Sequence, residues 1–575
     1  MSERLRRALL AIAFLIAVAG LFLVANRAAY RGYFVDDELD DLAFTGEMDA
    51  VDFVQGLLLP RFYTNNFRPA GHLFFYAMGE TAGLRFPPYI AVLHIFHIGN
   101  IVLLWLVLRR LTLPALAAAA GVLLFAFHMA TFDIYWKPMY VFDLLCGTFC
   151  LTAILFWLGD RWILSLIAFW IAYRAKEIAV MLPLVLAACE YFLGGRRWKR
   201  LIPFFAISLW FGVQGLLTNR PGSNDYSLHF TPGDIWRCAV FYSSKLLLVP
   251  YEGWAVVAGL VMVLIVLPVV VGLWQAKPPA PQYWIGLIAF AVLLAPMLLL
   301  PGRLSGAYLY VPLIGLAIAL AALASHRWVL IVVGVGLACW IPWNYLQLRA
   351  VRHEVMERAV DRRQFVAAMG TVARNHPEVT SYVFPHEDPL SNYGVRAAGR
   401  LLHPDAKNVL AASEDSATLP EAIQSPWLAY IVVDKTTHRV QTAVHTPYTT
   451  DLSYIRMGPA IPIWQLTGWY PGEDAFRWTK PHASARFLRP SDATAFEMYI
   501  NVSDEYIVRL KRSRVELSLN GVSLGGQDIT HSDWQTLRWS IPAAPSGPAE
   551  ITIDVSPAYP ANDPLGVAVS ALGFK

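Results

Sequence analysis

Long apolar runs fill most of the chain up to residue 346, and short runs of alternating apolar and polar residues fill its end. A helix needs about 20 predominantly apolar residues to cross ~30 Å of hydrocarbon. Runs of that length recur from residue 8 to about residue 346, which predicts roughly eleven membrane-spanning helices. The first run, residues 8 to 25, follows the basic segment SERLRR and lacks a small-residue cleavage site. We therefore expect an uncleaved membrane anchor.

Basic residues occur in alternate connections between the apolar runs. Because Lys and Arg of short loops are retained on the cytoplasmic side, these connections and the N-terminus are predicted to be cytoplasmic. The residues concerned are Arg4, Arg6, Arg7, Arg109, Arg110, Arg196, Arg197, Lys199 and Arg200. The same rule puts four parts outside: the loop 26 to 70, the connection 132 to 139, the segment 219 to 237 and the tail after about residue 350. That face would be the periplasm of a bacterial inner membrane, or its equivalent.

Composition agrees with a multi-pass membrane protein surrounded by lipid. The chain is 56% hydrophobic and 15% charged, with a mean hydropathy of +0.45, which excludes a soluble enzyme of this length. Its net charge of +4 is explained by the sidedness of the loops and indicates no nucleic-acid partner. All five cysteines fall in predicted spans, so the tail must fold without disulfides.

The pattern changes after WNYLQLRA, where we place a domain boundary near residue 350. Residues 351 to 375 read as a helix, and SYVF and AYIVVD read as buried strands, so residues 351 to 470 are predicted to form a small α/β module. Six period-two segments within residues 471 to 575 predict a β-sandwich that resembles carbohydrate-binding jelly rolls, with a hairpin turn at Asn520 and Gly521. Trp534 could stack on a sugar, although burial in the sandwich core is the more frequent role of such a residue.

Acidic residues crowd the segment FVDDELDD, residues 34 to 41, directly after the first predicted span. A solvated acidic cap would explain them, but other ionisable groups are predicted on the same face, and a charge at mid-bilayer costs about 2.5–3.5 kcal/mol on insertion scales. A structural ion pair, a snorkelling side chain or a headgroup contact would explain each one singly. These groups are Arg68 in FRPAGH, His128, Asp133 and Lys137 in FHMATFDIYWKP, Lys176 and Glu177 in YRAKEIAVMLP, and Arg303 in PGRLSGAYLYVP.

The order of these motifs resembles a known family. An acidic doublet after the first span is followed by RP, by His with an acidic residue a few places on, by KE opening a span and by Arg with YLYVP. This order resembles the polytopic glycosyltransferases of the GT-C class, and within it the protein O-mannosyltransferase-like and tetratricopeptide-bearing O-mannosyltransferase branch. The resemblance covers residues 1 to 346. The tail lacks tetratricopeptide repeats, and Asp133 stands where that branch usually has Glu.

The resemblance implies a polyprenyl or dolichyl phosphate sugar as donor. The sugar would pass, with inversion, to a protein or glycan acceptor on the extracytoplasmic face. Phosphate is a good leaving group, so one carboxylate acting as base on the acceptor hydroxyl suffices, and either Asp36 or Asp37 is the candidate.

Cationic groups would then stabilise the charge on the departing phosphate. The candidates for this role are Arg303 with Tyr308, Lys176 and Lys137, and those for acceptor binding or positioning are Arg68, Glu177, His128 and Asp133. Asp133 could also join the aspartates around Mg²⁺ or Mn²⁺, since both ions take oxygen ligands. A metal-free reaction is the alternative.

Two other functions fit a polytopic chain. A transporter or lipid-carrier flippase would need interrupted helices in two related halves, and no such internal symmetry is visible. A non-catalytic scaffold that presents a glycan-binding domain is the second alternative. The nucleophile-elbow pattern from Gly521 to Gly525 lies between predicted strands with no helix after it, which argues against a hydrolase. The chain also lacks the glycine patterns of nucleotide-binding loops.

Overall fold

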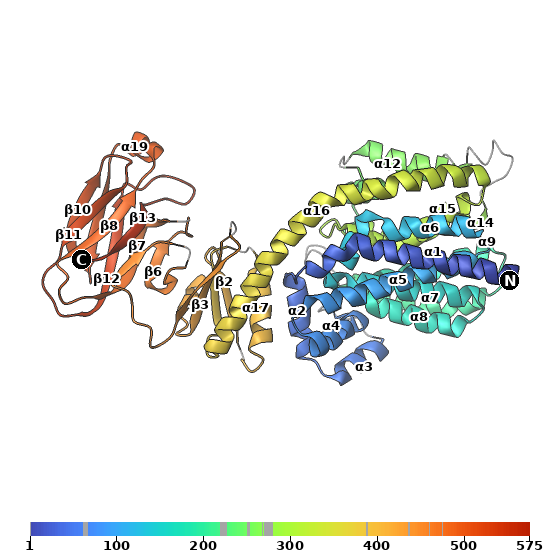
Figure 1. Cartoon of the computed structure of the whole chain (residues 1–575), viewed down its shortest axis with the longest axis horizontal. Helices are drawn as coiled ribbons and strands as arrows, with labels where there is room; N and C mark the ends of the chain where they lie inside the picture. The colour runs from blue at the N-terminus through green and yellow to red at the C-terminus, as the bar shows by residue number, and fades with distance from the viewer. Residues whose placement is uncertain are drawn as a thin grey trace. The chain divides into compact units, whose positions relative to one another are not determined.

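The computed structural model divides the chain into two compact units. It describes residues 2–60, 67–218, 227–249, 253–266, 268–269, 280–386, 389–406, 408–434, 437–458, 460–473 and 475–575, so part of the predicted segment 219 to 237 lies outside the described residues. The helical unit comprises Met1–Phe34 and Phe44–Met356, and the sheet-rich unit comprises Val35–Ala43 and Glu357–Lys575. Figure 1 draws both units and labels those of their elements for which there is room.

The helical unit is built from α-helices joined by short 3-10 segments. Its first helices are α1 (Glu3–Asn26), α3 (Ala50–Leu58), α4 (Pro69–Ala82), α5 (Phe86–Arg110), α6 (Ala115–Phe127), α7 (Val141–Leu158), α8 (Trp162–Ala175) and α9 (Leu182–Phe192). Later ones are α10 (Ile202–Thr218), α11 (Pro232–Leu247), α12 (Trp254–Val261), α14 (Pro281–Leu294), α15 (Pro312–Leu323) and α16 (Arg327–Asn375). The 3-10 segments that matter below are η1 (Arg27–Arg31), η2 (Met129–Tyr135), η3 (Pro138–Tyr140), η4 (Glu177–Met181) and η8 (Gly306–Leu309).

Five helices in the described residues are long and apolar enough to cross a membrane, or six if one bent pair counts as a single span. The five are Glu3–Arg31, Phe86–Arg110, Pro138–Leu158, Pro281–Leu299 and Arg327–Asn375; the pair, Ala115–Phe127 and Met129–Tyr135, is bent by 65°. Several apolar helices support a multi-pass membrane protein. The predicted total of roughly eleven spans and the cytoplasmic N-terminus remain predictions.

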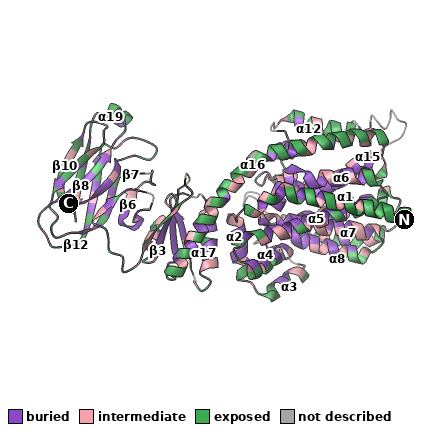
Figure 2. Ribbon diagram, viewed as in Figure 1, coloured by how far each residue is buried: buried purple, intermediate pink, exposed green. Residues whose placement is uncertain are grey.

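Burial distinguishes outer from inner helices. Only 11% of the most apolar window of Glu3–Arg31 is buried, against 67% for Pro138–Leu158. In Figure 2, α1 is therefore largely coloured as exposed, whereas α7 is largely buried. An apolar surface that the protein itself leaves uncovered is what a lipid-facing helix needs.

Glycines bring inner helices close together. A Cβ at Gly286 of α14 would overlap the backbone of α15, and a Cβ at Gly315 of α15 would overlap the backbone of α14. Small residues at such contacts let helix backbones approach, which is how apolar helices associate in lipid.

The sheet-rich unit begins with a four-stranded sheet in the order β2-β1-β3-β4. Its strands are β1 (Ser381–Phe384), β2 (Leu410–Ser413), β3 (Leu428–Val433) and β4 (Val440–His445), and its helices include α17 (Asn392–Leu402), α18 (Leu419–Ile423) and the start of α2 (Asp36–Gly46). β1 pairs in parallel with β2 and β3, and β4 pairs antiparallel with β3. The predicted strands SYVF and AYIVVD are therefore confirmed, and α16 covers the predicted helix 351 to 375.

A second sheet follows in the order β10-β9-β12-β7-β13-β8-β11, with β5 on β13 and β6 on β7. Its elements are β5 (Tyr454–Arg456), β6 (Leu466–Trp469), β7 (Arg477–Arg489), β8 (Ala495–Asn501), α19 (Asp504–Leu510), β9 (Ser513–Leu519), β10 (Val522–Ile529), β11 (Gln535–Ser540), β12 (Gly547–Ser556) and β13 (Ala568–Phe574). All six period-two segments form strands. Asn520 and Gly521 join β9 to β10 with positive φ angles of 50° and 81°, as a tight hairpin turn requires.

The half of this sheet formed by β10, β9, β12 and β7 and the half formed by β13, β8 and β11 share one apolar core. Phe487 of β7, Phe496 of β8 and Phe574 of β13 pack against one another with ring centroids 5.3–5.9 Å apart. A shared core between two halves is the arrangement of a sandwich, and the jelly-roll likeness stays a prediction. The expected burial of Trp534 is wrong: Trp534 is 37% exposed, and the tryptophan in the core is Trp539, which is 3% exposed.

Candidate functional site

Lys176 of the helical unit is held in a buried ion pair. It caps the C-terminus of α8, and its Nζ lies 2.6 Å from both Oδ1 and Oδ2 of Asp143 in the first turn of α7. Their side chains are 9% and 3% exposed. Nζ also lies 4.1 Å from the ring centroid of Tyr308 in η8. Three segments distant in sequence thus meet at one ammonium group, and the carboxylate keeps that charge compensated in an apolar setting.

A second ion pair lies beside the first. Arg68, just before α4, places its Nε 2.9 Å and 3.1 Å from the two carboxylate oxygens of Glu177, which opens η4. Its guanidinium lies 5.4 Å from the ring centroid of Phe142, the neighbour of Asp143. The Asp143 carboxylate accordingly interacts electrostatically with both Arg68 and Glu177.

Arg303 completes this group through Tyr308. The tyrosine interacts electrostatically with Arg303, and also with the members of both ion pairs. We refer to the six residues concerned as the ionic cluster: Arg68, Asp143, Lys176, Glu177, Arg303 and Tyr308. It contains three cations, two carboxylates and a phenol, drawn from four stretches of sequence in one unit.

The connection 132 to 139 lies next to the ionic cluster. Lys137 Nζ is 2.9 Å from Asp133 Oδ1, so these two predicted site residues pair with each other. Tyr140 Oη is 3.3 Å from Ser305 Oγ, which links this connection to the segment that carries Arg303. In the described part of the chain, no three His, Cys, Asp or Glu side chains gather as metal ligands would. The Asp133 carboxylate already has a cationic partner in Lys137.

His128 has a local role in the fold. Its buried ring accepts a hydrogen bond from the backbone N–H of Ala130 at 3.3 Å, which caps η2, and it packs on Trp340 with centroids 5.2 Å apart. This contact lies at the 65° bend between α6 and η2. A break in a helix leaves backbone groups without their helical partners, and the His128 ring satisfies one of them.

The predicted base residues, Asp36 and Asp37, begin α2 in the sheet-rich unit and contact α17 of the same unit. Asp36 Oδ1 accepts a hydrogen bond of 2.8 Å from the backbone N–H of Ser391, the residue that caps α17. Asp37 Oδ1 accepts one from the hydroxyl of Tyr393. A Cβ at Gly394 would overlap the carboxylate of Asp36, so the close approach requires glycine. These contacts give both carboxylates a defined position, which a solvated cap would lack.

Burial raises the pKa of Asp36 above its usual value. Hydrogen bonds from Ser391 and the charge of Arg362 oppose this effect, and the charge of Asp37 adds to it. The pKa of Asp40 is raised too, mainly by burial and then by the charge of Asp41. A carboxylate with a raised pKa is a stronger base than a fully solvated one.

Comparison with known proteins gives few matches. No protein-family model matches the chain, and no curated protein matches it. Its fold is similar to a cryo-EM structure of the arabinofuranosyltransferase AftD from mycobacteria, with 10% sequence identity, a TM-score of 0.41 and coverage of 97% of this chain and 58% of that one. A mutant form of AftD gives 11% identity, a TM-score of 0.35, and coverage of 96% and 60%. The chain thus spans about three fifths of the length of these structures.

The structure brings together Arg68, Lys176, Glu177, Arg303 and Tyr308. Their placement on one face of the membrane and their roles in a site stay predictions. Asp36 and Asp37 belong to the other unit, so their predicted convergence with these residues stays a prediction.

Sequence reasoning missed Asp143, the direct partner of Lys176. A lone carboxylate in the apolar run VFDLLCG was the available signal, because such a group needs a buried partner. Ser391, Tyr393 and Gly394 were also missed, and no local pattern identifies them, because their roles arise from a contact across more than 350 positions of the chain.

Proposed function

We propose that the chain is an integral-membrane glycosyltransferase that uses a polyprenyl or dolichyl phosphate sugar as donor. The ionic cluster is the observation that supports this most strongly. Three cationic side chains lie around Tyr308 in an apolar helical unit. Burying a charge there costs free energy unless the charge has a partner or binds a ligand. A phosphate-linked lipid supplies an anion at the membrane, which is the ligand that such a group of cations fits.

Lys176 and Arg303 would stabilise the negative charge that grows on the leaving phosphate. An ammonium is a compact charge and a guanidinium a planar fork, and both are used for phosphate. Asp143 and Glu177 would keep the cations compensated before the donor arrives. Electrostatic stabilisation of this kind is often worth several kcal/mol in a site that excludes water.

Asp36 or Asp37 would act as the base. The proton of the acceptor hydroxyl would pass to the carboxylate, the acceptor oxygen would form a bond to the anomeric carbon, and the bond from that carbon to the phosphate oxygen would break. The phosphate leaves with the electron pair, and the anomeric configuration is inverted. The raised pKa of Asp36 supports Asp36 in this role, with Asp37 orienting.

An exposed aromatic group on the sandwich supports a role of the tail in recognising a glycan acceptor. Trp534 and Tyr499 are 37% and 40% exposed, and their ring centroids lie 5.2 Å apart. Phe476 also packs against Trp534, with ring centroids 5.9 Å apart. Flat aromatic faces of this kind stack on sugars, so Trp534→Ala should weaken glycan binding by the purified full chain and leave its folding unchanged.

A transfer assay with short-chain lipid phosphate sugars tests the proposal. The donor panel contains mannosyl, glucosyl and arabinofuranosyl carriers, with mannosyl carriers first because of the sequence resemblance. The double variant Asp36→Asn with Asp37→Asn should lose transfer. A control that removes two exposed carboxylates, Asp405→Asn with Asp563→Asn, should keep it. Full transfer by the first double variant would refute the base assignment, and failure of every donor would refute the reaction.

The pH profile separates Asp36 from a solvated carboxylate. The base must be ionised, and burial raises the pKa of Asp36 above 3.8, so activity should fall with decreasing pH at a pH above that value. An acidic limb at or below 3.8 would contradict Asp36 as the base.

Movement of the carrier lipid between leaflets without any glycosidic bond would instead favour the flippase alternative.

A further inference from the structure

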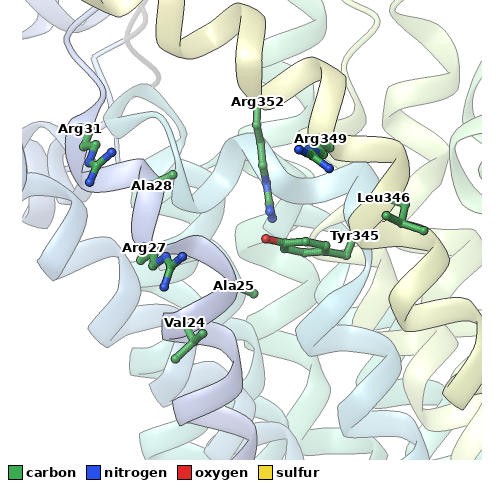
Figure 3. A pocket seen from close by; sticks show the side chains of 9 residues that line it. All are labelled: Val24, Ala25, Arg27, Ala28, Arg31, Tyr345, Leu346, Arg349 and Arg352. Carbon is green, nitrogen blue, oxygen red and sulfur yellow. The ribbon is translucent and has the colours of Figure 1, made fainter.

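A cationic pocket lies where the first candidate span ends. It has a volume of about 600 Å³ and is formed by the end of α1 with η1 on one side and by the stretch Tyr345–Arg352 of α16 on the other. Four arginines line it: Arg27, Arg31, Arg349 and Arg352 (Figure 3). No carboxylate is among its described lining residues. The pocket shares no residue with the ionic cluster.

Arg352 is fixed in position within this pocket. Its guanidinium donates to Oδ1 of the buried Asn26 at 3.2 Å, and Trp136 Nε1 donates to the same oxygen at 2.9 Å. The guanidinium also lies 5.3 Å from the ring centroid of Trp136 and 4.7 Å from that of Tyr345. Its buried Nε has no hydrogen-bond acceptor among the residues that the structure describes. In Figure 3 the side chain extends into the space between the two helices, on the side of the Tyr345 hydroxyl.

The chemistry of the pocket fits a phosphate. Arg27, Arg349 and Arg352 bring like charges to one space, and an anion that accepts hydrogen bonds from several of them relieves their repulsion. The planar fork of Arg matches phosphate oxygens in pairs, which makes Arg the side chain most suited to such a ligand. A space of about 600 Å³ is far larger than a bare phosphate needs and lies within the range of sites for organic ligands.

The apolar edge of the pocket indicates that the phosphate belongs to a lipid. Val24 of α1 and Leu346 of α16 line it beside the arginines, and both are more than half exposed. Both belong to candidate membrane spans, Glu3–Arg31 and Arg327–Asn375. An acyl chain could follow these surfaces while the headgroup meets the arginines, which is how basic pockets between spanning helices hold anionic lipids.

We propose that this pocket binds the phosphate of an anionic lipid headgroup, with the acyl chains along α1 and α16. Arg352 supplies the preformed contact, and Arg27 and Arg349 supply the charge that selects an anionic lipid over a zwitterionic one. The site is independent of the proposed sugar transfer, so it can exist whether or not the chain is a glycosyltransferase.

Binding of phosphatidylglycerol to the full chain tests this site. The lipid is titrated into detergent-purified protein, bound lipid is counted by intact mass spectrometry, and phosphatidylcholine serves as the zwitterionic comparison. The wild type should retain phosphatidylglycerol in preference to phosphatidylcholine. Arg27→Gln with Arg349→Gln should bind it about 30-fold more weakly, since each basic residue near an anionic lipid contributes about a factor of five.

The control removes two exposed arginines from the other end of α1, as Arg4→Gln with Arg6→Gln, and should bind like the wild type. Equal binding of phosphatidylglycerol by the pocket variant and the wild type would overturn the proposal. A separate titration with inorganic pyrophosphate in lipid-free micelles identifies the source of the phosphate. Binding of pyrophosphate to the wild type without binding of phosphatidylglycerol would also overturn it, since the ligand would then be soluble.

Discussion

Each unit of the molecule contains a buried ion pair next to a tyrosine. In the helical unit Lys176 pairs with Asp143 beside Tyr308, and in the sheet-rich unit Arg477 pairs with Glu414 beside Tyr430. The side chains are 9% and 3% exposed in the first pair and 2% and 3% exposed in the second. Burial and pairing alone therefore do not distinguish a site from a structural contact.

The surroundings of the two pairs differ. Arg477 Nη1 lies 2.6 Å from Glu414 Oε2, and Nη2 lies 3.0 Å from Glu414 Oε1 and 2.8 Å from Tyr430 Oη, whose hydroxyl donates back to Glu414. Arg477 Nη1 also lies 3.5 Å from the backbone oxygen of Tyr470. We call this the closed network because none of its three side chains is exposed. The pair at Lys176 instead borders Arg68 and Glu177, whose side chains are 16% and 41% exposed. A network with access to solvent can exchange a partner for a ligand, whereas a closed one stabilises a fold.

The largest expected effect lies at the closed network. Arg477→Met leaves Glu414 buried without its cation, which should lower the free energy of unfolding of the sheet-rich unit by about 3–5 kcal/mol. Hydrogen exchange at the amides of β7 in the full chain measures this loss. Glu414→Gln combined with Arg477→Met removes both charges and should recover most of it. A single variant as stable as the wild type would show that the network is dispensable.

The next effect tests the open pair by the same design. Asp143→Asn combined with Lys176→Met removes both charges, so the helical unit should remain folded. Thermal unfolding in detergent measures this. Transfer should nevertheless fall by about 10²–10³-fold, since the cation facing the leaving phosphate is lost. The double variant at Glu414 and Arg477 should keep transfer close to that of the wild type. Equal transfer by both double variants would remove the functional distinction between the pairs.

The same contrast shows what the sequence could predict. Period-two runs predicted six strands of the second sheet because their alternation follows burial directly, as in β9 and β12. The period-two runs do not include β10, because a register shift between Ser523 and Gly525 breaks its alternation, although the predicted hairpin at Asn520 and Gly521 implies a strand there. Likewise, a continuous apolar run gives no sign of the break at His128, which divides α6 from η2.

The candidate site could be predicted by residue type but not by pairing. Charges in or beside apolar runs identified Arg68, Lys176 and Glu177, because such groups need a reason to persist there. That Arg68 meets Glu177 across 109 positions depends on helix packing, which local pattern does not specify. Asp143 escaped notice because a single carboxylate barely changes the mean hydropathy of its run.

A smaller effect is expected where α17 meets the acidic segment. A Cβ at Gly394 would overlap the Asp36 carboxylate and lie 3.1 Å from the Asp36 Cα, so Gly394→Ala must displace α2 or α17. Overpacking of this kind should destabilise the sheet-rich unit by about 1–3 kcal/mol. The control is Gly370→Ala in α16, where a Cβ would meet only ordinary contacts at 3.5 Å and 3.6 Å. Thermal unfolding that separates the two variants by less than the error would contradict the close fit of Asp36.

The smallest effect concerns Ser391, which contacts both α17 and Asp36. Its Oγ accepts from the N–H of Gly394 at 3.5 Å and caps α17, so Ser391→Ala should cost about 1 kcal/mol of stability. The backbone N–H to Asp36 survives the substitution, but the side-chain hydrogen bond that lowers the pKa of Asp36 is lost. The pKa of Asp36 should therefore rise further, and the acidic limb of the transfer profile should move to higher pH. An unchanged limb together with reduced stability would mean that Ser391 serves α17 alone and that Asp36 does not set the pH dependence.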